Sequence, residues 1–353
     1  VIGNGMAGIR TVEELLKLDP EKYAITVFGA EPLPNYNRIL LSPVLTGEKV
    51  FSDIVLNDDL WYAEHRITLH KGRTVVAIDR RNRRVTTADG ATAPYDRLPV
   101  ATGSTPFMLP VAGNTLPGVI GFRDLADVNA MIDAARGFHH AVVIGGGLLG
   151  LEAANGLMKQ GMKVTVIHLP DVLMERQLDA PAAKMLRKSL EERGLQFVMG
   201  GQTEEIIGLK SGNKSRVQGV RLKDGRELTA DLVVMAVGIR PNIALAKQAG
   251  LYCERGIVVS DTMQTYDPAI YAVGECVQHR GQTYGLVAPL FEQAKVCANH
   301  LAHFGIARYE GSVTSTKLKV TGIDLFSAGD FTGNDQTEEI VLQDAGAGVY
   351  KKV

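Results

Sequence analysis

The chain has 353 residues, of which 38 are lysine or arginine and 39 are aspartate or glutamate. A chain of this length suits two or three domains. Its nearly balanced charge excludes the basic footprint of a nucleic-acid-binding protein. The basic run from Arg80 to Arg84 is therefore interpreted as a solvated hairpin turn rather than a phosphate-binding track.

Cysteine usage and hydropathy narrow the class further. Cys253, Cys276 and Cys297 are widely spaced and form no metal-ligand pattern, which predicts no metal site and a reduced, cytoplasmic setting. No apolar run approaches the length of a membrane span, so no membrane partner is expected. Only Val1 and Ile2 precede the first glycines, and a strand predicted near Val353 has no stop signal, so the chain is expected to be part of a longer polypeptide.

The chain begins with a glycine-rich turn between a strand and a helix. Gly3, Gly5 and Gly8 follow the apolar residues Val1 and Ile2. A helix is predicted over residues 9–18 and a strand over residues 24–28. This order of strand, glycine turn, helix and strand is the pattern of a dinucleotide-binding fingerprint.

A second copy of the pattern follows about 140 residues later. An apolar strand, residues 141–144, leads into Gly145, Gly147 and Gly150; a helix through Leu157 and a strand over residues 164–167 come next. In each copy the first glycine permits the tight turn, the second lets the backbone approach a pyrophosphate, and the third lets helix and strand pack closely. Two copies predict two nucleotide sites on two similar domains.

Other elements are predicted from local signals. The loop after the first βα unit carries Glu31, a candidate for the adenosine ribose, and Arg38, a candidate for the pyrophosphate; the alternatives are a solvated acid and an exposed turn arginine. Pro99 lies unexpectedly within a predicted strand, because proline removes a ladder donor. The remaining predicted elements are strands over 75–79, 84–87, 231–236, 256–260, 270–273, 338–342 and 348–353, a hairpin turn at Asp224-Gly225, a helix over 180–193 with Asp179 as cap and Pro181 in its first turn, and a helix over 289–304 whose buried face is Phe291, Ala294, Val296, Ala298 and Leu301.

Five ordered motifs resemble the two-dinucleotide-binding-domain flavoprotein family, whose members are similar to pyridine nucleotide-disulfide oxidoreductases. The motifs are Gly3–Gly8, Ala101-Thr102-Gly103, Gly145–Gly150, Val237-Gly238 and Thr265–Glu275. The resemblance implies an α/β fold of two Rossmann-like three-layer domains. In this fold an FAD domain, residues 1–115 and 242–310, is split by an inserted NAD(P)H domain, residues 116–241. A truncated β-rich segment, residues 311–353, follows.

Site residues are carried over by this likeness. Glu275 is expected on the ribityl chain, Arg38 by the FAD pyrophosphate, Val75 by the adenine, Glu152 near the isoalloxazine and nicotinamide, and Val287 and Lys319 at the far side of the flavin. Pro43 stands where related reductases have a lysine, which leaves open whether Glu152 has a cationic partner. No residue is assigned as catalytic with certainty. The full set of expected cofactor-binding residues is Gly3, Gly5, Met6, Ala7, Gly8, Glu31, Arg38, Val75, Ala101, Thr102, Gly103, Gly145, Gly147, Leu148, Gly150, Glu152, His168, Gly238, Gly274, Glu275, Val287 and Lys319.

Within the family, the electron acceptor distinguishes the subgroups. The chain has neither a redox cysteine pair nor a cysteine near Ser42, and Cys276 is expected to be a small buried filler. The chain resembles reductases that pass electrons from NAD(P)H through FAD to iron proteins, and above all the N-terminal module of assimilatory NAD(P)H-dependent nitrite reductase large subunits. This resemblance implies that iron–sulfur and sirohaem domains for the reduction of nitrite to ammonia follow in the same polypeptide.

Two other functions remain open at this point. A stand-alone reductase would serve a small redox protein, rubredoxin or ferredoxin. A nucleotide-sensing flavoprotein would instead act through partner binding without turnover. The segment from Gly311 onward is compatible with a homodimer face and with a cover over the flavin.

The choice between NADH and NADPH depends on the end of the second strand of the inserted domain. An NAD site usually has an acid there, which holds both ribose hydroxyls, but His168 occupies the position. Without that carboxylate, and with an imidazole that can protonate, NADPH or dual use is slightly favoured. The alternative is that His168 only caps the strand while Asp171 or Glu175 serves the ribose.

Overall fold

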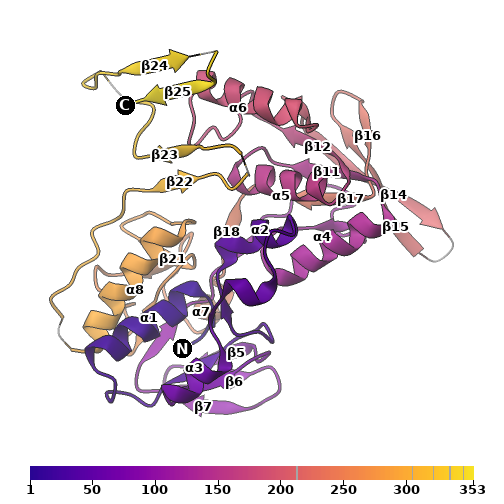
Figure 1. The fold of residues 1–353 in the computed structure, drawn as a ribbon. Coiled ribbons are helices and arrows are strands. Elements are labelled where there is room, and N and C mark those ends of the chain that lie inside the picture. The colour runs from indigo at the N-terminus through magenta and orange to yellow at the C-terminus, as the bar shows by residue number, and fades with distance from the viewer. Residues whose placement is uncertain (212–213, 304, 321, 334, 345) are drawn as a thin grey trace. The chain divides into compact units, whose positions relative to one another are not determined.

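The computed structural model describes residues 1–211, 214–303, 305–320, 322–333, 335–344 and 346–353. The chain forms two compact units, shown in Figure 1. Unit 1 consists of residues 1–38, 51–105 and 239–314, and unit 2 of residues 39–50, 106–238 and 315–353. One unit is thus interrupted by the other, and the segment 39–50, which sequence analysis left in the first domain, groups with unit 2.

Unit 1 is built on a parallel sheet. Its strands run in the order β4, β1, the residues around Ile2, β8 and β20. The elements of unit 1 are α1 (Met6–Leu18), β1 (Thr26–Phe28), β2 (Asn35–Tyr36), β3 (Val55–Asn57), α3 (Asp59–Glu64), β4 (Thr68–His70), β5 (Val75–Asp79), β6 (Arg84–Thr87), β7 (Thr92–Pro94), β8 (Leu98–Val100), α7 (Ala244–Gln248), β19 (Ile257–Val259), β20 (Ile270–Ala272), β21 (Val277–His279) and α8 (Val287–Leu301). Four further elements lie where the chain passes from one unit to the other in sequence. They are a 3-10 turn (Arg38–Leu40), a second 3-10 turn (Phe51–Ile54), β9 (Ser104–Pro106) and β18 (Ile239–Pro241).

Pro99 fits the central strand β8 without losing a hydrogen bond toward β20. Its carbonyl accepts the Ile2 N–H at 2.9 Å, whereas the β20 side is served by Leu98, whose N–H donates to Ala269, and by Val100, whose carbonyl accepts from Val273. The missing donor of proline therefore affects only the other side of the strand.

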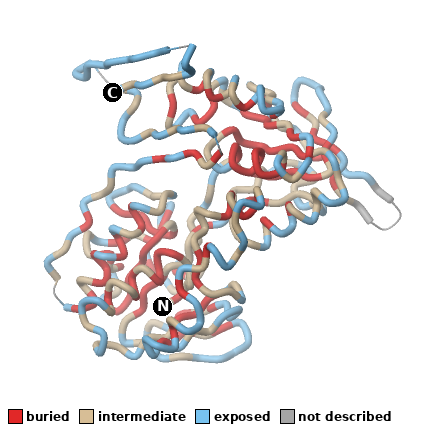
Figure 2. Tube along the Cα trace, viewed as in Figure 1, coloured by how far each residue is buried: buried red, intermediate tan, exposed pale blue. Residues whose placement is uncertain are grey.

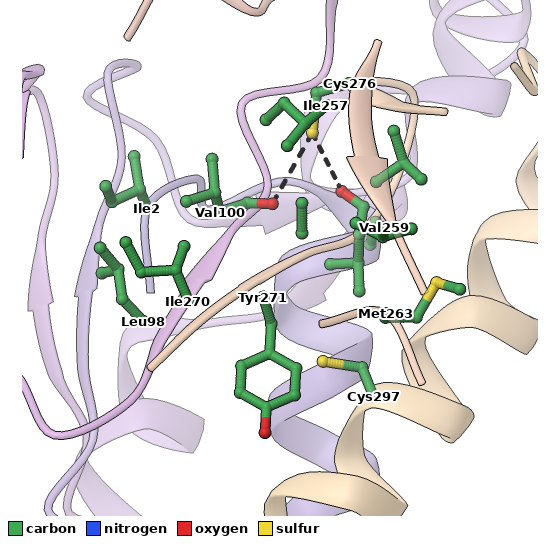
Figure 3. Close-up of a cluster of buried hydrophobic side chains, with 14 of the residues drawn as sticks. Ile2, Leu98, Val100, Ile257, Val259, Met263, Ile270, Tyr271, Cys276 and Cys297 are labelled. Carbon is green, nitrogen blue, oxygen red and sulfur yellow. Dashed lines mark hydrogen bonds between the residues drawn. The ribbon is translucent and has the colours of Figure 1, made fainter. Parts of the chain in front are cut away.

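The core of unit 1 gathers around this sheet. Figure 3 shows side chains from β8, β19, β20 and α8 packed together with Ile2. Cys276 and Cys297 are fully buried among them, and burial raises the pKa of both thiols. The Cys276 thiol donates to the carbonyls of Val100 and Val273. Its expected role as a buried filler therefore agrees with its surroundings.

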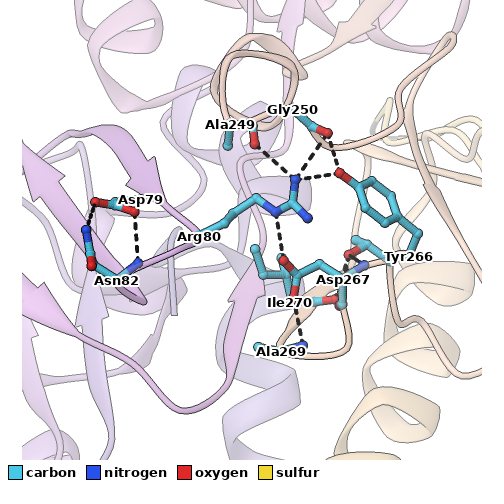
Figure 4. A network of polar contacts seen from close by, with 10 residues as sticks. Asp79, Arg80, Asn82, Ala249, Gly250, Tyr266, Asp267, Ala269 and Ile270 are labelled. Atoms are coloured by element: carbon cyan, nitrogen blue, oxygen red, sulfur yellow. Dashed lines mark hydrogen bonds and ion pairs between the residues drawn. The ribbon is translucent and has the colours of Figure 1, made fainter.

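The basic run after β5 is a hairpin turn, as predicted. The Asp79 carboxylate accepts hydrogen bonds from the backbone and side chain of Asn82, which closes the turn. Arg80 donates to Asp267 at 2.7 Å and lies over the ring of Tyr266 (Figure 4). The Asp267 carboxylate also caps the Ala269 N–H, so the segment before β20 is held by a local turn as well as by Arg80.

Unit 2 contains the second glycine turn. Its elements are α2 (Leu41–Leu45), β10 (Val119–Ile120), α4 (Leu125–Gly137), β11 (His140–Ile144), α5 (Leu148–Lys159), β12 (Lys163–His168), α6 (Ala180–Glu192), β13 (Gln196–Met199), β14 (Thr203–Ser211), β15 (Lys214–Leu222), β16 (Glu227–Thr229), β17 (Leu232–Met235), β22 (Ser315–Lys317), β23 (Phe326–Ala328), β24 (Val341–Asp344) and β25 (Val349–Lys352). β22 with β23, and β24 with β25, form antiparallel pairs in the C-terminal segment.

A five-stranded parallel sheet, in the order β10, β17, β11, β12, β13, is the centre of unit 2. Alternate residues of its strands, such as Val142, Ile144 and Ile167, pack against the antiparallel sheet β14–β16. On the other side α5 packs against β11, β12 and α4. Figure 2 shows the strands and α5 as mostly buried. The predicted α/β class with Rossmann-like layers is confirmed.

Two helix predictions show how local signals and packing differ. The Asp179 carboxylate accepts the Ala182 N–H at 3.1 Å and Pro181 lies in the first turn, so α6 begins where predicted. α8 begins at Val287, earlier than predicted, and the predicted end at Phe304 lies outside the described residues. Phe291 is only partly buried and lies under Arg10, so its predicted place in the buried face is wrong.

Candidate functional site

The glycine turn of unit 1 has one open face. Gly3 has a φ of 114°, and a Cβ there would lie 2.1 Å from the Ala101 carbonyl oxygen. A Cβ on Gly8 would lie 2.4 Å from the Gly3 carbonyl oxygen, whereas a Cβ on Gly5 would meet nothing within 4 Å. Met6 and Ala7 open α1, whose first turn has no side-chain cap and no acidic residue. The space beside Gly5 is therefore open, and the uncapped first turn of the helix suits a diphosphate.

The glycine turn of unit 2 repeats this geometry. Gly145 has a φ of 117°, and a Cβ on Gly150 would lie 1.9 Å from the Gly145 carbonyl oxygen. A Cβ on Gly147 would meet nothing within 4 Å, and α5, which begins at Leu148, also lacks a side-chain cap and an acid in its first turn. Each unit thus has its own cradle for a dinucleotide phosphate.

Glu31 and Arg38, predicted as independent cofactor ligands, are bonded to each other. The Arg38 guanidinium donates to one Glu31 carboxylate oxygen, and the Tyr36 hydroxyl donates to the other at 2.7 Å. Arg38 also lies over the Tyr36 ring at 5.0 Å. The pair is neither a lone solvated acid nor a lone turn arginine, because each side chain fixes the other beside the first cradle.

The motif residues after β8 and β20 meet within unit 1. The Thr102 hydroxyl donates to the Asn242 carbonyl at 2.8 Å, and the Asn242 amide donates back to the Thr102 carbonyl at 2.9 Å. The Ser104 hydroxyl donates to the Glu275 carboxylate at 2.7 Å. The Gly274 N–H donates to Gln293 of α8. Ala101, Thr102, Gly103, Gly274 and Glu275 therefore lie at the carboxyl ends of neighbouring strands, where α/β folds bind ligands.

Glu152 is a buried acid that two residues of unit 2 contact. It is 4% exposed on α5, accepts a hydrogen bond from the Ser42 hydroxyl and accepts the Lys319 backbone N–H at 3.0 Å. The Lys319 ammonium lies 4.0 Å away. Burial raises the pKa of Glu152, and Lys319 and Ser42 oppose that rise.

The question of a cationic partner for Glu152 is thereby answered within unit 2. Lys319, which was expected at the far side of the flavin, supplies the ammonium that Pro43 cannot. Sequence reasoning gave Ser42 no role beyond marking an absent cysteine. Its only signal was the small hydroxyl residue before Pro43, and the contact joins residues 110 positions apart.

Both ring nitrogens of His168 are used inside the protein. The Gly146 N–H donates to Nδ1 at 3.0 Å, and Nε2 lies 3.0 Å from the Val172 carbonyl and 3.2 Å from the Glu175 carboxylate. The side chain is 7% exposed. These contacts support the alternative in which His168 caps the strand, and they leave no ring nitrogen for a 2′-phosphate.

The remaining expected ligands are placed as follows. Val75 is buried at the start of β5, and Val287 is the first residue of α8. Gly238 has a φ of 111°, and its carbonyl accepts the Phe107 N–H.

Two family models cover almost all of the chain. Residues 1–300 match pyridine nucleotide-disulphide oxidoreductases, and residues 315–353 match the C-terminal domain of rubredoxin NAD+ reductases. The chain belongs to the pyridine nucleotide-disulphide oxidoreductase family. Membership in this family confirms an oxidoreductase module that uses FAD and NAD(P)H, and the two open glycine cradles fit these cofactors.

Among relatives in the pyridine nucleotide-disulphide oxidoreductase family, two come from Bacillus subtilis (strain 168). A nitrite reductase [NAD(P)H] is 53% identical over 100% of this chain and 43% of its own length. An assimilatory nitrate reductase electron transfer subunit is 50% identical over 99% of this chain and 45% of its own. The chain therefore spans less than half the length of either relative.

A solved structure of the covalent putidaredoxin reductase–putidaredoxin complex is similar with a TM-score of 0.87. It is 30% identical, and the match covers 97% of this chain and 83% of that one. Within the residues described, no helix is both long and apolar enough to cross a membrane.

Proposed function

We propose that this chain is the reductase module of an assimilatory nitrite reductase in the cytoplasm. It takes electrons from NAD(P)H through FAD and delivers them to an iron–sulfur and sirohaem centre, where nitrite is reduced to ammonia. The observation that carries the proposal is the 53% identity to a nitrite reductase [NAD(P)H] over the whole of this chain.

In this proposal each unit positions one cofactor. Unit 1 binds FAD through the first glycine turn, the Glu31–Arg38 pair and Glu275, and unit 2 binds NAD(P)H through the second turn. Bound FAD supplies the chemistry that converts a hydride donor into a source of single electrons. Glu152, with Ser42 and Lys319, provides a charge-balanced buried carboxyl on the helix that follows the NAD(P)H turn.

Anaerobic mixing of the FAD-loaded protein with NADH or NADPH tests the reductase step. The visible absorbance of the flavin should bleach with at least one of the two nucleotides. A well-folded, FAD-loaded protein that neither nucleotide bleaches would contradict the proposed function.

A second candidate is a reductase that serves a separate small iron protein. It is favoured by the match of residues 315–353 to the rubredoxin NAD+ reductase C-terminal domain, and by the putidaredoxin reductase likeness. The native reading frame distinguishes the two. Cysteines with iron-ligand spacing beyond Val353 support the nitrite reductase module. A frame that stops soon after Val353, together with fast reoxidation of the reduced protein by rubredoxin or ferredoxin, supports the stand-alone reductase.

A homodimer formed through residues 311–353 stays a prediction. Analytical ultracentrifugation of the FAD-loaded chain, with and without that segment, measures it directly.

A further inference from the structure

A carboxylate stands beside the second glycine turn although the usual acid position holds a histidine. Glu175 lies seven residues after the end of β12, but its carboxylate is 3.2 Å from Nε2 of His168. The Glu175 side chain is 40% exposed, so its carboxylate contacts His168 and is still accessible to solvent. The chain thus returns an acid to the neighbourhood of the strand end by folding the loop back.

The hydrogen bonds of His168 define where its proton lies. Nδ1 accepts the Gly146 N–H, and a ring nitrogen that accepts a hydrogen bond carries no proton. The proton of the neutral ring is therefore on Nε2, which faces the Val172 carbonyl and the Glu175 carboxylate. His168 donates toward the acid and so orients it.

The backbone around Glu175 is tied to the same glycine turn. The Gly146 carbonyl accepts the Met174 N–H at 3.0 Å, and the Gly146 N–H donates to His168 at the end of β12. Met174 is fully buried and has a φ of 51°, a left-handed conformation that is uncommon for a residue with a side chain. Such backbones persist where the surroundings hold them, often at ligand sites. The backbone before Glu175 is therefore hydrogen-bonded directly to the glycine turn.

We propose that Glu175, positioned by His168, is the carboxylate that binds the adenosine ribose of the nucleotide and makes this module selective for NADH. The inference rests on the proposed function, because it requires that the second glycine turn binds a pyridine nucleotide. A carboxylate accepts hydrogen bonds from both ribose hydroxyls, and it repels the two negative charges of a 2′-phosphate. Glu175 therefore favours NADH, whereas His168 considered alone favoured NADPH or dual use.

Equilibrium binding of NAD+ and NADP+ to the FAD-loaded protein, measured by isothermal titration calorimetry, tests this assignment without turnover. The unmodified chain should bind NAD+ at least about tenfold more tightly than NADP+. Glu175→Gln, which keeps the shape and removes the charge, should weaken NAD+ binding several-fold and tighten NADP+ binding, so that the preference falls by about tenfold or more.

His168→Asn examines the positioning role. Asparagine keeps an acceptor near the Gly146 N–H but cannot reach Glu175, so the preference for NAD+ should fall partly, together with some loss of stability because His168 is buried. A purely structural role for His168 would lower stability and leave the ratio of the two affinities unchanged.

Asp171→Asn is the matched control, because Asp171 is an exposed acid in the same loop. It should leave the ratio of affinities unchanged. The inference is overturned if Asp171→Asn rather than Glu175→Gln changes the ratio. It is also overturned if the unmodified chain prefers NADP+ and loses that preference in Arg176→Gln. Equal binding of both nucleotides refutes this inference alone, whereas binding of neither refutes the proposed function as well.

Discussion

The two glycine turns have the same backbone contacts, but they differ in which residue beside the turn carries a side chain. In unit 1 the Gly3 N–H donates to the Phe28 carbonyl, and in unit 2 the Gly145 N–H donates to the Ile167 carbonyl, each at 2.8 Å. Asn4 of the first turn thus corresponds to Gly146 of the second. The next residue of each strand also corresponds: Gly29 in unit 1 and His168 in unit 2.

The side chain and the glycine have exchanged places between the two turns. A Cβ on Gly29 would lie 2.8 Å from the Asn4 Cβ, and a Cβ on Gly146 would lie 2.8 Å from the His168 ring. Asn4 donates to the Leu33 carbonyl, and His168 contacts the Val172 carbonyl; these acceptors lie four residues after Gly29 and His168 respectively. A side chain therefore contacts the following loop in both units. It comes from the turn in unit 1, where it is Asn4, and from the end of the strand in unit 2, where it is His168.

The two units also differ in the acidic residue that follows the turn and strand. In unit 1 Glu31 is paired with the Arg38 guanidinium, whereas in unit 2 the Glu175 carboxylate contacts the His168 imidazole and, within the described residues, forms no ion pair with a lysine or arginine. A carboxylate that is not paired with a cation keeps its negative charge available to discriminate against a phosphate. The comparison thus explains why the second site, and not the first, is the one expected to select between nucleotides.

The third glycines should give the largest effects, because their added Cβ atoms meet backbone. Gly150→Ala and Gly8→Ala should each cost about 1–3 kcal/mol or more through overpacking, and should abolish binding of NAD+ and of FAD respectively. Chemical denaturation and calorimetry measure the two losses. Gly147→Ala and Gly5→Ala are the controls, since their Cβ atoms meet nothing within 4 Å and should leave stability nearly unchanged. Equal destabilisation by all four changes would contradict the shared geometry.

Because Asn4 and Gly29 share one space, a change at one residue should compensate for a change at the other. Gly29→Ala should destabilise unit 1 by about 1–3 kcal/mol because of the Asn4 side chain, and Asn4→Gly in the same chain should recover part of that loss. A double-mutant cycle in urea gives the coupling energy. Additive losses would mean that the two residues do not share the space.

Glu152 should give a pH-dependent effect in unit 2. Because burial raises its pKa above the ordinary value of 4.5, the folded state keeps the proton over a wider pH range than the unfolded state. Its contribution to stability is fully present below the unfolded pKa and is lost as pH rises through the folded pKa. The melting temperature of Glu152→Gln minus that of the unmodified chain should therefore increase from about pH 4 to about pH 8. Glu192→Gln, an exposed acid on α6, should show no such trend.

The pair beside the first turn should give the smallest change in stability. Arg38 and Glu31 are 25% and 32% exposed, so Arg38→Gln should cost only about 0–1 kcal/mol. FAD affinity should nevertheless fall several-fold, because Arg38 is expected at the pyrophosphate. A fluorescence titration of apoprotein with FAD measures this. Unchanged FAD affinity would leave the pair with a structural role only.

Local patterns were sufficient where the signal is carried by neighbouring residues. Both glycine turns, the Asp179 cap of α6 and the hairpin turn after β5 were predicted because their geometry depends on residues within a few positions of each other. The boundaries of α8 and the position of Phe291 were predicted less well. The packing of that helix depends on α1 and on strands far away in sequence.

The sequence by itself determined that the chain has two dinucleotide cradles, because glycine spacing and strand periodicity act through local sterics. The tertiary structure alone decided the partners of the charged residues. Lys319 reaches Glu152 across 167 positions, and a left-handed Met174 turns Glu175 back toward His168. Such contacts depend on how distant segments fold together, and no periodicity in the chain records them.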